Sequence, residues 1–257
     1  MTLYEGLIAE NILSKKGAFF QPDYADAMAR LVNIDGFWFA MDYERIEAIG
    51  LEFKSYKPFN SVLHISEIQD LALFLANIVD AKSPFTYHHS QKVAQIAKQL
   101  ASDSGLSEAN CDMVYVAGLL HDVGKLKTPD DILYKDGPLE GVELSIMKRH
   151  SVDTMITMDN FFPDSKIGQW AANHHEKLDG SGYPYQLKGE QLDIESRIIA
   201  IADIFQALSQ NRPYRGQLSF EEIEKIMLPM VEEGKLDKDV FSLIQKKESE
   251  YYSMSLS

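Results

Sequence analysis

The chain has 257 residues, a hydrophobic fraction of 45%, a charged fraction of 25% and a net charge of −14. This length suits one large domain or a domain with a smaller companion, and no apolar run is long enough to span a membrane. The acidic balance argues against binding long nucleic acid, but it permits a small phosphorylated ligand held by local cations or metal ions. The single cysteine and the lack of a signal-peptide pattern predict a cytoplasmic protein.

The first 80 residues contain no motif with a recognisable chemistry. Short helices are predicted at about residues 8–13 and 24–32, and a longer one at 62–79, where apolar residues recur at helical spacing. We interpret residues 1–80 as a regulatory or dimerising segment, with a packing extension of the main domain as an equal alternative.

Residues 81–257 show a helical pattern that glycine and proline turns interrupt. One predicted helix ends at Gly105, and the next begins at an N-cap, Ser107, and runs into His121 and Asp122. Two further helices are predicted at 219–232 and 238–247, and the serine-rich tail after Tyr251 is expected to fray. The sequence therefore predicts an all-α fold with a helical bundle at 81–257 and a small, mainly helical N-terminal segment.

Six of the seven histidines lie between residues 88 and 175. His89, His150 and His174 each extend an apolar helix face, where a single histidine is more often a core residue bonded to a carbonyl. Several such groups together indicate a metal site, because burying them is costly unless a shared ion compensates. The candidate ligands are His89, His121, Asp122, His150, His174, His175 and Asp203.

This number of ligands exceeds the needs of one ion. Two ions bridged by a carboxylate fit the count, and Asp122 is our choice for the bridge. Histidine and carboxylate ligands without cysteine suit iron, manganese, zinc, cobalt or nickel, and they leave the identity of the metal open.

Three motifs carry a resemblance to a known family. They are His121-Asp122-Val123-Gly124-Lys125, His174-His175-Glu176 and Asp179-Gly180-Ser181-Gly182-Tyr183-Pro184. The first motif alone is weak, but the combination resembles the HD-GYP family of cyclic dinucleotide phosphodiesterases within the HD phosphohydrolase superfamily. Segments 197–203 and 212–215 are also similar, so that the resemblance covers about residues 80–220.

The resemblance implies an HD-type helical bundle whose seven candidate ligands hold two divalent ions, iron or alternatively manganese. It also implies that the ions activate a water, and that the hydroxide cuts cyclic di-GMP to the linear dinucleotide, with further cleavage to GMP left open. His150 would be a ligand at the end of its helix. Asp122 and Lys125 would be catalytic, with Lys125 at the scissile phosphate or leaving oxygen. The residues expected to hold the dinucleotide are Lys125, Gly182, Tyr183, Arg212 and Arg215.

Two positions depart from the pattern of the family. Phe85 replaces a glutamate that helps some members to hold a third metal, which predicts two metals here. Gln206 stands where an aspartate is common, which removes a negative charge near the site. Glu176 is expected either to orient a ligand histidine or to lie in solvent. His88 is expected outside the cluster, and His64 has no assigned function.

Other functions remain open at this point. The chain is alternatively a weak or inactive member that binds a cyclic dinucleotide or a protein partner as a sensor. A third possibility is an HD hydrolase for another nucleotide, such as a hybrid cyclic dinucleotide or a mononucleotide. A homodimer and a signalling protein are left open as partners, and no membrane partner is expected.

Overall fold

The computed structural model describes residues 9–18, 20–34, 36–37, 63–82, 88–163, 165–211 and 216–256. Within these ranges the regular elements are helices, and the only β-type pairings are isolated bridges from Lys16 to Phe20 and from Asp179 to Lys188. The predicted all-α fold is thus confirmed. None of the described helices is long and apolar enough to cross a membrane.

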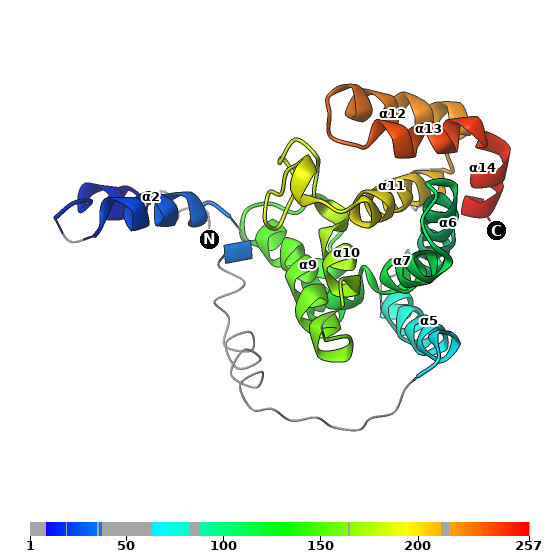
Figure 1. Ribbon diagram of the computed structural model, residues 1–257, viewed down its shortest axis with the longest axis horizontal. Coiled ribbons are helices and arrows are strands. Elements are labelled where there is room, and N and C mark those ends of the chain that lie inside the picture. The colour runs from blue at the N-terminus through cyan, green and yellow to red at the C-terminus, as the bar shows by residue number, and fades with distance from the viewer. Residues whose placement is uncertain are drawn as a thin grey trace.

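The N-terminal part contributes short helices and one long one, as predicted. Residues 9–14 are helical, α2 covers Pro22–Leu31, and α5 covers Ile65–Lys82. Figure 1 shows α2 at one side of the bundle and α5 against α7. Because α5 contributes Ala72, Ala76 and Val79 to the core, it packs as part of the bundle. The predicted domain boundary after residue 80 stays a prediction.

The centre of the bundle consists of α6 (His89–Asp103), α7 (Glu108–Leu120) and α11 (Ile194–Ser209), which pack on one another. Apolar residues at helical spacing on α6 and α11 are fully buried, among them Ile96, Leu100 and Ile198. Ser107 caps α7 by accepting a hydrogen bond from the backbone N–H of Asn110, as the sequence predicts. This packing fixes the helix ends that carry the candidate ligands.

A second group of elements covers one end of this centre. After α7 come η1 (Val123–Lys127) and α8 (Asp130–Leu133), and then α9 (Val142–Phe161), α10 (Ile167–Ala172), η2 (Asn173–His175) and η3 (Gly189–Gln191). The sequence placed His150 at the end of its helix, but α9 continues for eleven residues beyond it, to Phe161. The side chains of Val152 and Ile156, in the turns after His150, are buried against Tyr185. This apolar packing stabilises the continued helix.

Three helices complete the C-terminal end: α12 (Phe220–Glu232), α13 (Lys238–Lys246) and α14 (Glu248–Leu256). Ser219 and Glu222 form a capping box at the start of α12. The expected fraying after Tyr251 is wrong for the described residues, because α14 continues to Leu256 and Ser255 is 1% exposed. Tyr251 is itself fully buried, and its hydroxyl donates to Asp103 at 2.8 Å. These contacts tie α14 to α6.

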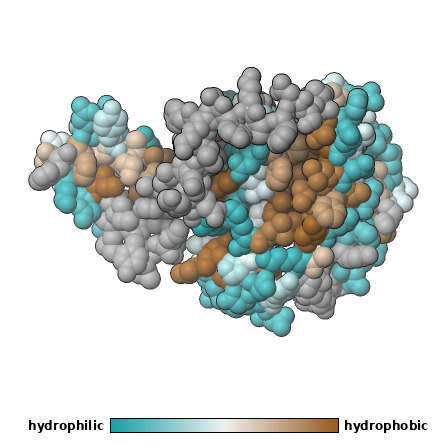
Figure 2. All heavy atoms as spheres, turned by 90° about the horizontal axis from the view of Figure 1, so that it is seen from below, coloured by the Kyte–Doolittle hydropathy of each residue, from teal (hydrophilic) through white to brown (hydrophobic). Residues whose placement is uncertain are grey.

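Apolar side chains also gather on one face of the surface. Figure 2 views the molecule from below, the side on which α5 lies in Figure 1, and shows a broad apolar area there. On α5 the exposed large apolar residues are Leu71, Phe74 and Ile78.

Candidate metal centre

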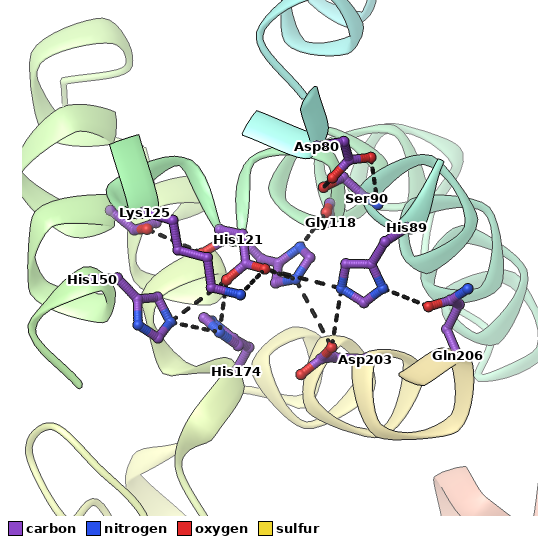
Figure 3. A network of polar contacts seen from close by, with 12 residues as sticks. Asp80, His89, Ser90, Gly118, His121, Lys125, His150, His174, Asp203 and Gln206 are labelled. Atoms are coloured by element: carbon purple, nitrogen blue, oxygen red, sulfur yellow. Dashed lines mark hydrogen bonds and ion pairs between the residues drawn. The ribbon is translucent and has the colours of Figure 1, made fainter. Parts of the chain in front are cut away.

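The seven predicted ligands meet at the end of the central helices. Figure 3 shows side chains from α6, α7, α9, η2 and α11 pointing toward one another. Their ligand atoms form three overlapping groups in which all atoms lie within 4.8 Å: His150, His174 and His175; His89, His121 and Asp203; and His121, Asp122 and His174. We call these seven residues the seven-residue cluster. The structure brings these seven residues together, and their role as ligands stays a prediction.

Local helix geometry aims three of the histidines. His121, His150 and His174 each place Nδ1 within 2.6–2.8 Å of the carbonyl oxygen three residues earlier, on Gly118, Met147 and Ala171. A carbonyl only accepts hydrogen bonds, so we assign the proton of each ring to Nδ1. Each Nε2 is then directed into the cluster, the orientation that a metal-binding imidazole requires.

Asp122 lies at the middle of the cluster. Its Oδ2 is 3.3 Å from Nε2 of His121 and 4.0 Å from Nε2 of His89. Its Oδ1 is 3.6 Å from Nε2 of His150 and 3.7 Å from Nε2 of His174. The two carboxylate oxygens therefore face two different sets of histidines.

Several buried polar atoms in the cluster lack a hydrogen-bond partner among the described residues, and a cation could bind them. Among the described residues, Nε2 of His121 and Oδ1 of Asp122 are buried without a hydrogen-bond partner. The Nε2 atoms of His150 and His174 are 3.4 Å apart, so two lone pairs face each other. Leaving such groups unpaired costs free energy, and divalent ions would satisfy all of them. The donor set fits a pair of divalent metal ions.

Burial and neighbouring charges divide the histidines into two classes. Burial lowers the pKa of His150 to about 4 and that of His174 to about 3, and it also lowers the pKa of His175 well below 6.5. Burial acts against the charged form of His121 as well, but the nearby carboxylate of Asp122 outweighs it and raises the pKa to about 9. His150, His174 and His175 are thus neutral and ready to bind metal, while His121 carries a proton that a metal ion would replace.

The two carboxylates are ionised. Burial opposes their charge, but Lys125 and His121 hold the pKa of Asp122 well below 3.8, and His89 and His121 do the same for Asp203. Lys125 places Nζ 2.6 Å from Oδ2 of Asp122, and its side chain is 21% exposed. The cluster therefore has a fixed cation at its edge, where a phosphate can reach it.

The residues after the cluster form its outer edge, and we call residues 176–187 the rim loop. The ring of Tyr183 lies 4.7 Å from the ring of His175, centroid to centroid, with an angle of 33° between their planes. Nζ of Lys148, on α9, is 5.4 Å from the centroid of Tyr183. Tyr183 therefore lies beside the cluster, and its predicted role in holding the dinucleotide stays a prediction. Sequence reasoning missed Lys148, and helical periodicity gives no signal that would single it out.

Glu176 has a different role from either of the two that the sequence suggested. It is 2% exposed, and its carboxylate accepts hydrogen bonds from the backbone N–H groups of Tyr185 and Leu187 at 2.7 and 3.0 Å. It is therefore neither in solvent nor bonded to a ligand histidine; it holds the rim loop together. Gly182 packs on this same residue, because a Cβ there would lie 2.4 Å from Cα of Glu176.

The remaining predicted positions divide into described and undescribed ones. Phe85, Arg212 and Arg215 lie outside the described residues, so the expectations attached to them stay predictions. His88 and His64 are exposed and lie outside the cluster, as expected. Gln206 is fully buried and contacts His89, a contact that the sequence did not predict.

Comparison with known proteins gives a consistent result. The model of the HD domain family matches residues 74–240. The 3′3′-cGAMP-specific phosphodiesterase 1 of Vibrio cholerae is 45% identical over 241 residues, which are 94% of this chain and 56% of the relative. The cyclic di-GMP phosphodiesterase of Thermotoga maritima is 33% identical over 201 residues, 72% of this chain and 55% of the relative.

A solved structure also matches. The structure of an HDG"Y"P protein from Bdellovibrio bacteriovorus superposes with a TM-score of 0.54 at 17% identity, covering 96% of this chain and 80% of that one. At this identity the likeness shows the fold alone. The chain spans about half the length of these and other curated relatives that it matches.

Proposed function

The chain belongs to the HD domain family, and from that premise we propose that it hydrolyses a phosphodiester bond of a cyclic dinucleotide with two divalent metal ions held by the seven-residue cluster. The resemblance to HD-GYP proteins stated from the sequence is confirmed by the matched relatives. The activity itself is our inference, because the chain spans only about half of each of these relatives.

The observation that carries this proposal is the position of Asp122. One of its oxygens faces His89 and His121, and the other faces His150 and His174. A carboxylate that joins two sets of ligands is the arrangement expected of a bridge between two metal ions. On this basis, His89, His121 and Asp203 would hold one ion, His150, His174 and His175 the other, and Asp122 both.

Bound divalent ions would supply Lewis acidity and lower the pKa of water at the site. The reaction adds one water across a P–O3′ bond. The water oxygen bonds to phosphorus, the P–O3′ bond breaks, and the 3′ oxygen leaves with a proton. The product is a linear dinucleotide with a 5′-phosphate and a 3′-hydroxyl.

The residues of the chain around the cluster would position the substrate. Lys125 lies at the edge of the cluster and brings a positive charge that stabilises the phosphate as negative charge develops on it. Tyr183 offers an aromatic surface for a base, and Lys148 beside it offers a second cation. These local cations let a chain of net charge −14 bind an anionic substrate.

The choice of cyclic dinucleotide is the finer part of the proposal. The sequence suggested cyclic di-GMP, and a hybrid dinucleotide was an alternative. Three relatives from Vibrio cholerae are named for 3′3′-cGAMP, and one of them is the 45% identical protein. Relatives named for cyclic di-GMP are 29–37% identical. We therefore propose 3′3′-cGAMP as the preferred substrate and cyclic di-GMP as a weaker one.

Hydrolysis by the purified protein tests this proposal. The protein is loaded with Mn²⁺ or, without oxygen, with Fe²⁺, and its metal content is measured. It is then incubated with 3′3′-cGAMP, cyclic di-GMP and cyclic di-AMP, and the linear products are separated by chromatography. We expect two metal ions per chain, linear product, and the highest kcat/KM for 3′3′-cGAMP.

Two variants locate the activity. Asp122→Ala removes the central carboxylate and is expected to lower turnover by more than about 10³-fold, beyond the loss from a single oxyanion contact. Asp239→Ala removes an exposed aspartate on α13, far from the cluster in the chain, and should behave as the wild type. Wild-type turnover by Asp122→Ala would refute the site, and metal-loaded protein that cuts none of the three substrates would refute the function.

A further inference from the structure

We propose that Gln206 is the positioning residue for His89: it accepts a hydrogen bond from Nδ1 of the ring and so directs Nε2 into the seven-residue cluster. This inference rests on the proposed metal centre. Oε1 of Gln206 lies 2.5 Å from Nδ1 of His89, and both side chains are buried, with exposures of 0% and 3%. The contact joins α11 to α6, and Figure 3 shows it on the far side of the ring from His121.

The position of His89 explains why it needs this partner. The three histidines described above each donate Nδ1–H to a carbonyl three residues earlier in the chain. His89 is the first residue of α6, so its own helix has no carbonyl at that distance. A ring without an acceptor at Nδ1 can rotate or carry its proton on Nε2, and a proton on Nε2 blocks metal binding. Among the described residues, Gln206 on α11 supplies the acceptor.

One helix face of α11 contacts both nitrogens of the ring. Asp203 Oδ1 is 3.3 Å from Nε2 of His89, and Gln206 is one helical turn further along α11. Residues three apart lie on the same helix face, and their spacing of about 5–6 Å suits the two ends of an imidazole with its hydrogen bonds. The pair thus sets both the rotation of the ring and its tautomer.

The amide of glutamine can point either atom at His89. We assign the oxygen, because an Nδ1–H donated to a carbonyl oxygen is what the other three rings show. The amide nitrogen then has no hydrogen-bond partner among the described residues. The opposite assignment would make Gln206 a donor and force the proton of His89 onto Nε2, facing Asp203. The two assignments predict different behaviour in variants.

This contact gives a reason for the glutamine at position 206. From the sequence, Gln206 was interpreted as the loss of an aspartate, and so of a negative charge, near the site. In the structure it faces the outer nitrogen of a ligand ring, where a neutral oxygen accepts a hydrogen bond as well as a carboxylate does. The cluster already contains two buried carboxylates, and a third would add a desolvation cost. The substitution therefore keeps the acceptor and avoids one buried charge.

Metal binding by three variants tests the proposal. Gln206→Leu keeps the approximate volume and removes the acceptor, while Gln206→Glu keeps an acceptor and cannot donate when ionised. Ser209→Ala is the control, because Ser209 is buried one turn further along α11 and its hydroxyl donates to the backbone oxygen of Gln206 and not to its side chain. Titration calorimetry with Mn²⁺ alone gives the affinity of each site, and circular dichroism and urea unfolding of the metal-free proteins check the fold.

We expect Gln206→Leu to weaken one of the two Mn²⁺ sites by about 10–100-fold, the usual effect of losing the outer partner of a ligand histidine. Gln206→Glu should restore most of this affinity, and Ser209→Ala should match the wild type. Wild-type affinity in Gln206→Leu would show that Gln206 only fills space. If Gln206→Glu loses as much Mn²⁺ affinity as Gln206→Leu, Gln206 acts as a hydrogen-bond donor to His89. Either result overturns the proposal.

A measurement on the unmutated chain covers the case in which Gln206→Leu does not fold. Zn²⁺ suits the same ligand types and is diamagnetic. In the Zn²⁺-loaded wild type, long-range ¹H–¹⁵N correlation spectra should show His89 protonated at Nδ1 with slow exchange. A proton on Nε2 of His89 overturns this inference alone. A wild type that binds neither Mn²⁺ nor Zn²⁺ overturns the metal centre and this inference with it.

Discussion

The seven-residue cluster and the rim loop lie side by side but are held in place in different ways. The cluster takes its side chains from separate helices, and backbone carbonyls within those helices aim His121, His150 and His174. The rim loop is an irregular segment that one buried carboxylate, Glu176, holds through backbone N–H groups. Tyr183 is the point where the two regions touch.

This difference assigns different tasks to the two regions. A metal centre needs ligands fixed to a fraction of an ångström, and helices that are packed into a core provide this. A substrate-binding surface needs a shape and contacts that match the ligand, and a loop on a rigid scaffold provides them. We therefore expect changes in the cluster to alter metal binding, and changes in the rim loop to alter KM while metal content is unchanged.

Acid should act on the cluster more strongly than any single substitution in either region. The folded protein keeps His150, His174 and His175 neutral, with pKa values of about 4, about 3 and well below 6.5. The unfolded chain binds these protons near 6.5. As pH falls from 6.5 toward 4, each histidine therefore lowers the free energy of unfolding by up to about 1.4 kcal/mol per pH unit.

His121 does not offset this loss. Its pKa is raised to about 9 in the folded protein, so its contribution is complete below 6.5 and is lost only between 6.5 and 9. Urea unfolding of metal-free protein at pH 7 and pH 5 should show a fall of several kcal/mol. His174→Gln should reduce the fall, and His64→Gln, at an exposed position, should not. Equal stability at both values of pH would show that these histidines are not buried as neutral rings.

Gly124→Ala should give the largest effect of a single methyl group. A Cβ at Gly124 would lie 2.0 Å from the carbonyl oxygen of His150 and 2.6 Å from the backbone nitrogen of Thr154. Both are backbone atoms of α9, so η1 and α9 must separate. We expect a loss of about 3 kcal/mol in the free energy of unfolding, at the upper end of overpacking effects.

The same separation moves Asp122 and Lys125 away from His150. Metal analysis of Gly124→Ala should therefore show less than two ions per chain, together with a lowered urea midpoint. A variant that binds both ions with wild-type affinity would mean that the cluster does not depend on this helix contact.

Gly182→Ala applies the same chemical change to the rim loop. The added Cβ would lie 2.4 Å from Cα of Glu176 and 2.5 Å from the backbone nitrogen of Lys177, so the loop must shift. We expect a stability loss of about 1–2 kcal/mol. Metal content should stay at the wild-type value, while KM rises roughly tenfold, the effect of one lost contact of about 1.4 kcal/mol.

Gly189→Ala is the matched control for this variant. It lies just beyond the rim loop, where the nearest atoms to an added Cβ are 3.8 Å away, an ordinary contact distance. Its KM and stability should equal those of the wild type. Loss of metal in Gly182→Ala would remove the distinction between the two regions.

The two regions also differ in how well the sequence predicts them. Ligands on helices could be predicted because helical periodicity places His89, His150 and His174 on buried faces, and the motif His121-Asp122 follows a helix. The position of His150 within α9 could not be predicted, because the residues that pack against the second half of this helix are distant in sequence. The same holds for α14, whose Tyr251 is buried by a partner on α6.

Side-chain contacts between segments that are distant in the chain, or with irregular backbone, could not be predicted from the sequence. Glu176 follows two ligand histidines, so orienting one of them was a natural expectation, but the carboxylate turns to the backbone of the rim loop. Gln206 contacts a residue 117 positions away. Such pairs depend on how α6 and α11 pack, and no local pattern in the chain encodes that distance.

The smallest predicted effect concerns Gly36, which contacts the rim loop from the part of the chain before α5. The N–H of Gly36 donates to the carbonyl oxygen of Pro184 at 3.0 Å, and a Cβ at Gly36 would lie 2.4 Å from a ring carbon of Tyr185. A side chain can move aside more easily than backbone. Gly36→Ala should therefore cost no more than about 1 kcal/mol, the value of one hydrogen bond.

Gly36→Ala separates two ways in which the rim loop could be held. If residues before α5 help to position it, KM should change by roughly two- to fivefold, which corresponds to less than 1 kcal/mol, while metal content is unchanged. If Glu176 holds the loop alone, KM should stay at the wild-type value. Gly216→Ala, where an added Cβ meets no atom within 4 Å, is the control. A change in metal content would contradict both, because the cluster is held by the helices and not by this segment.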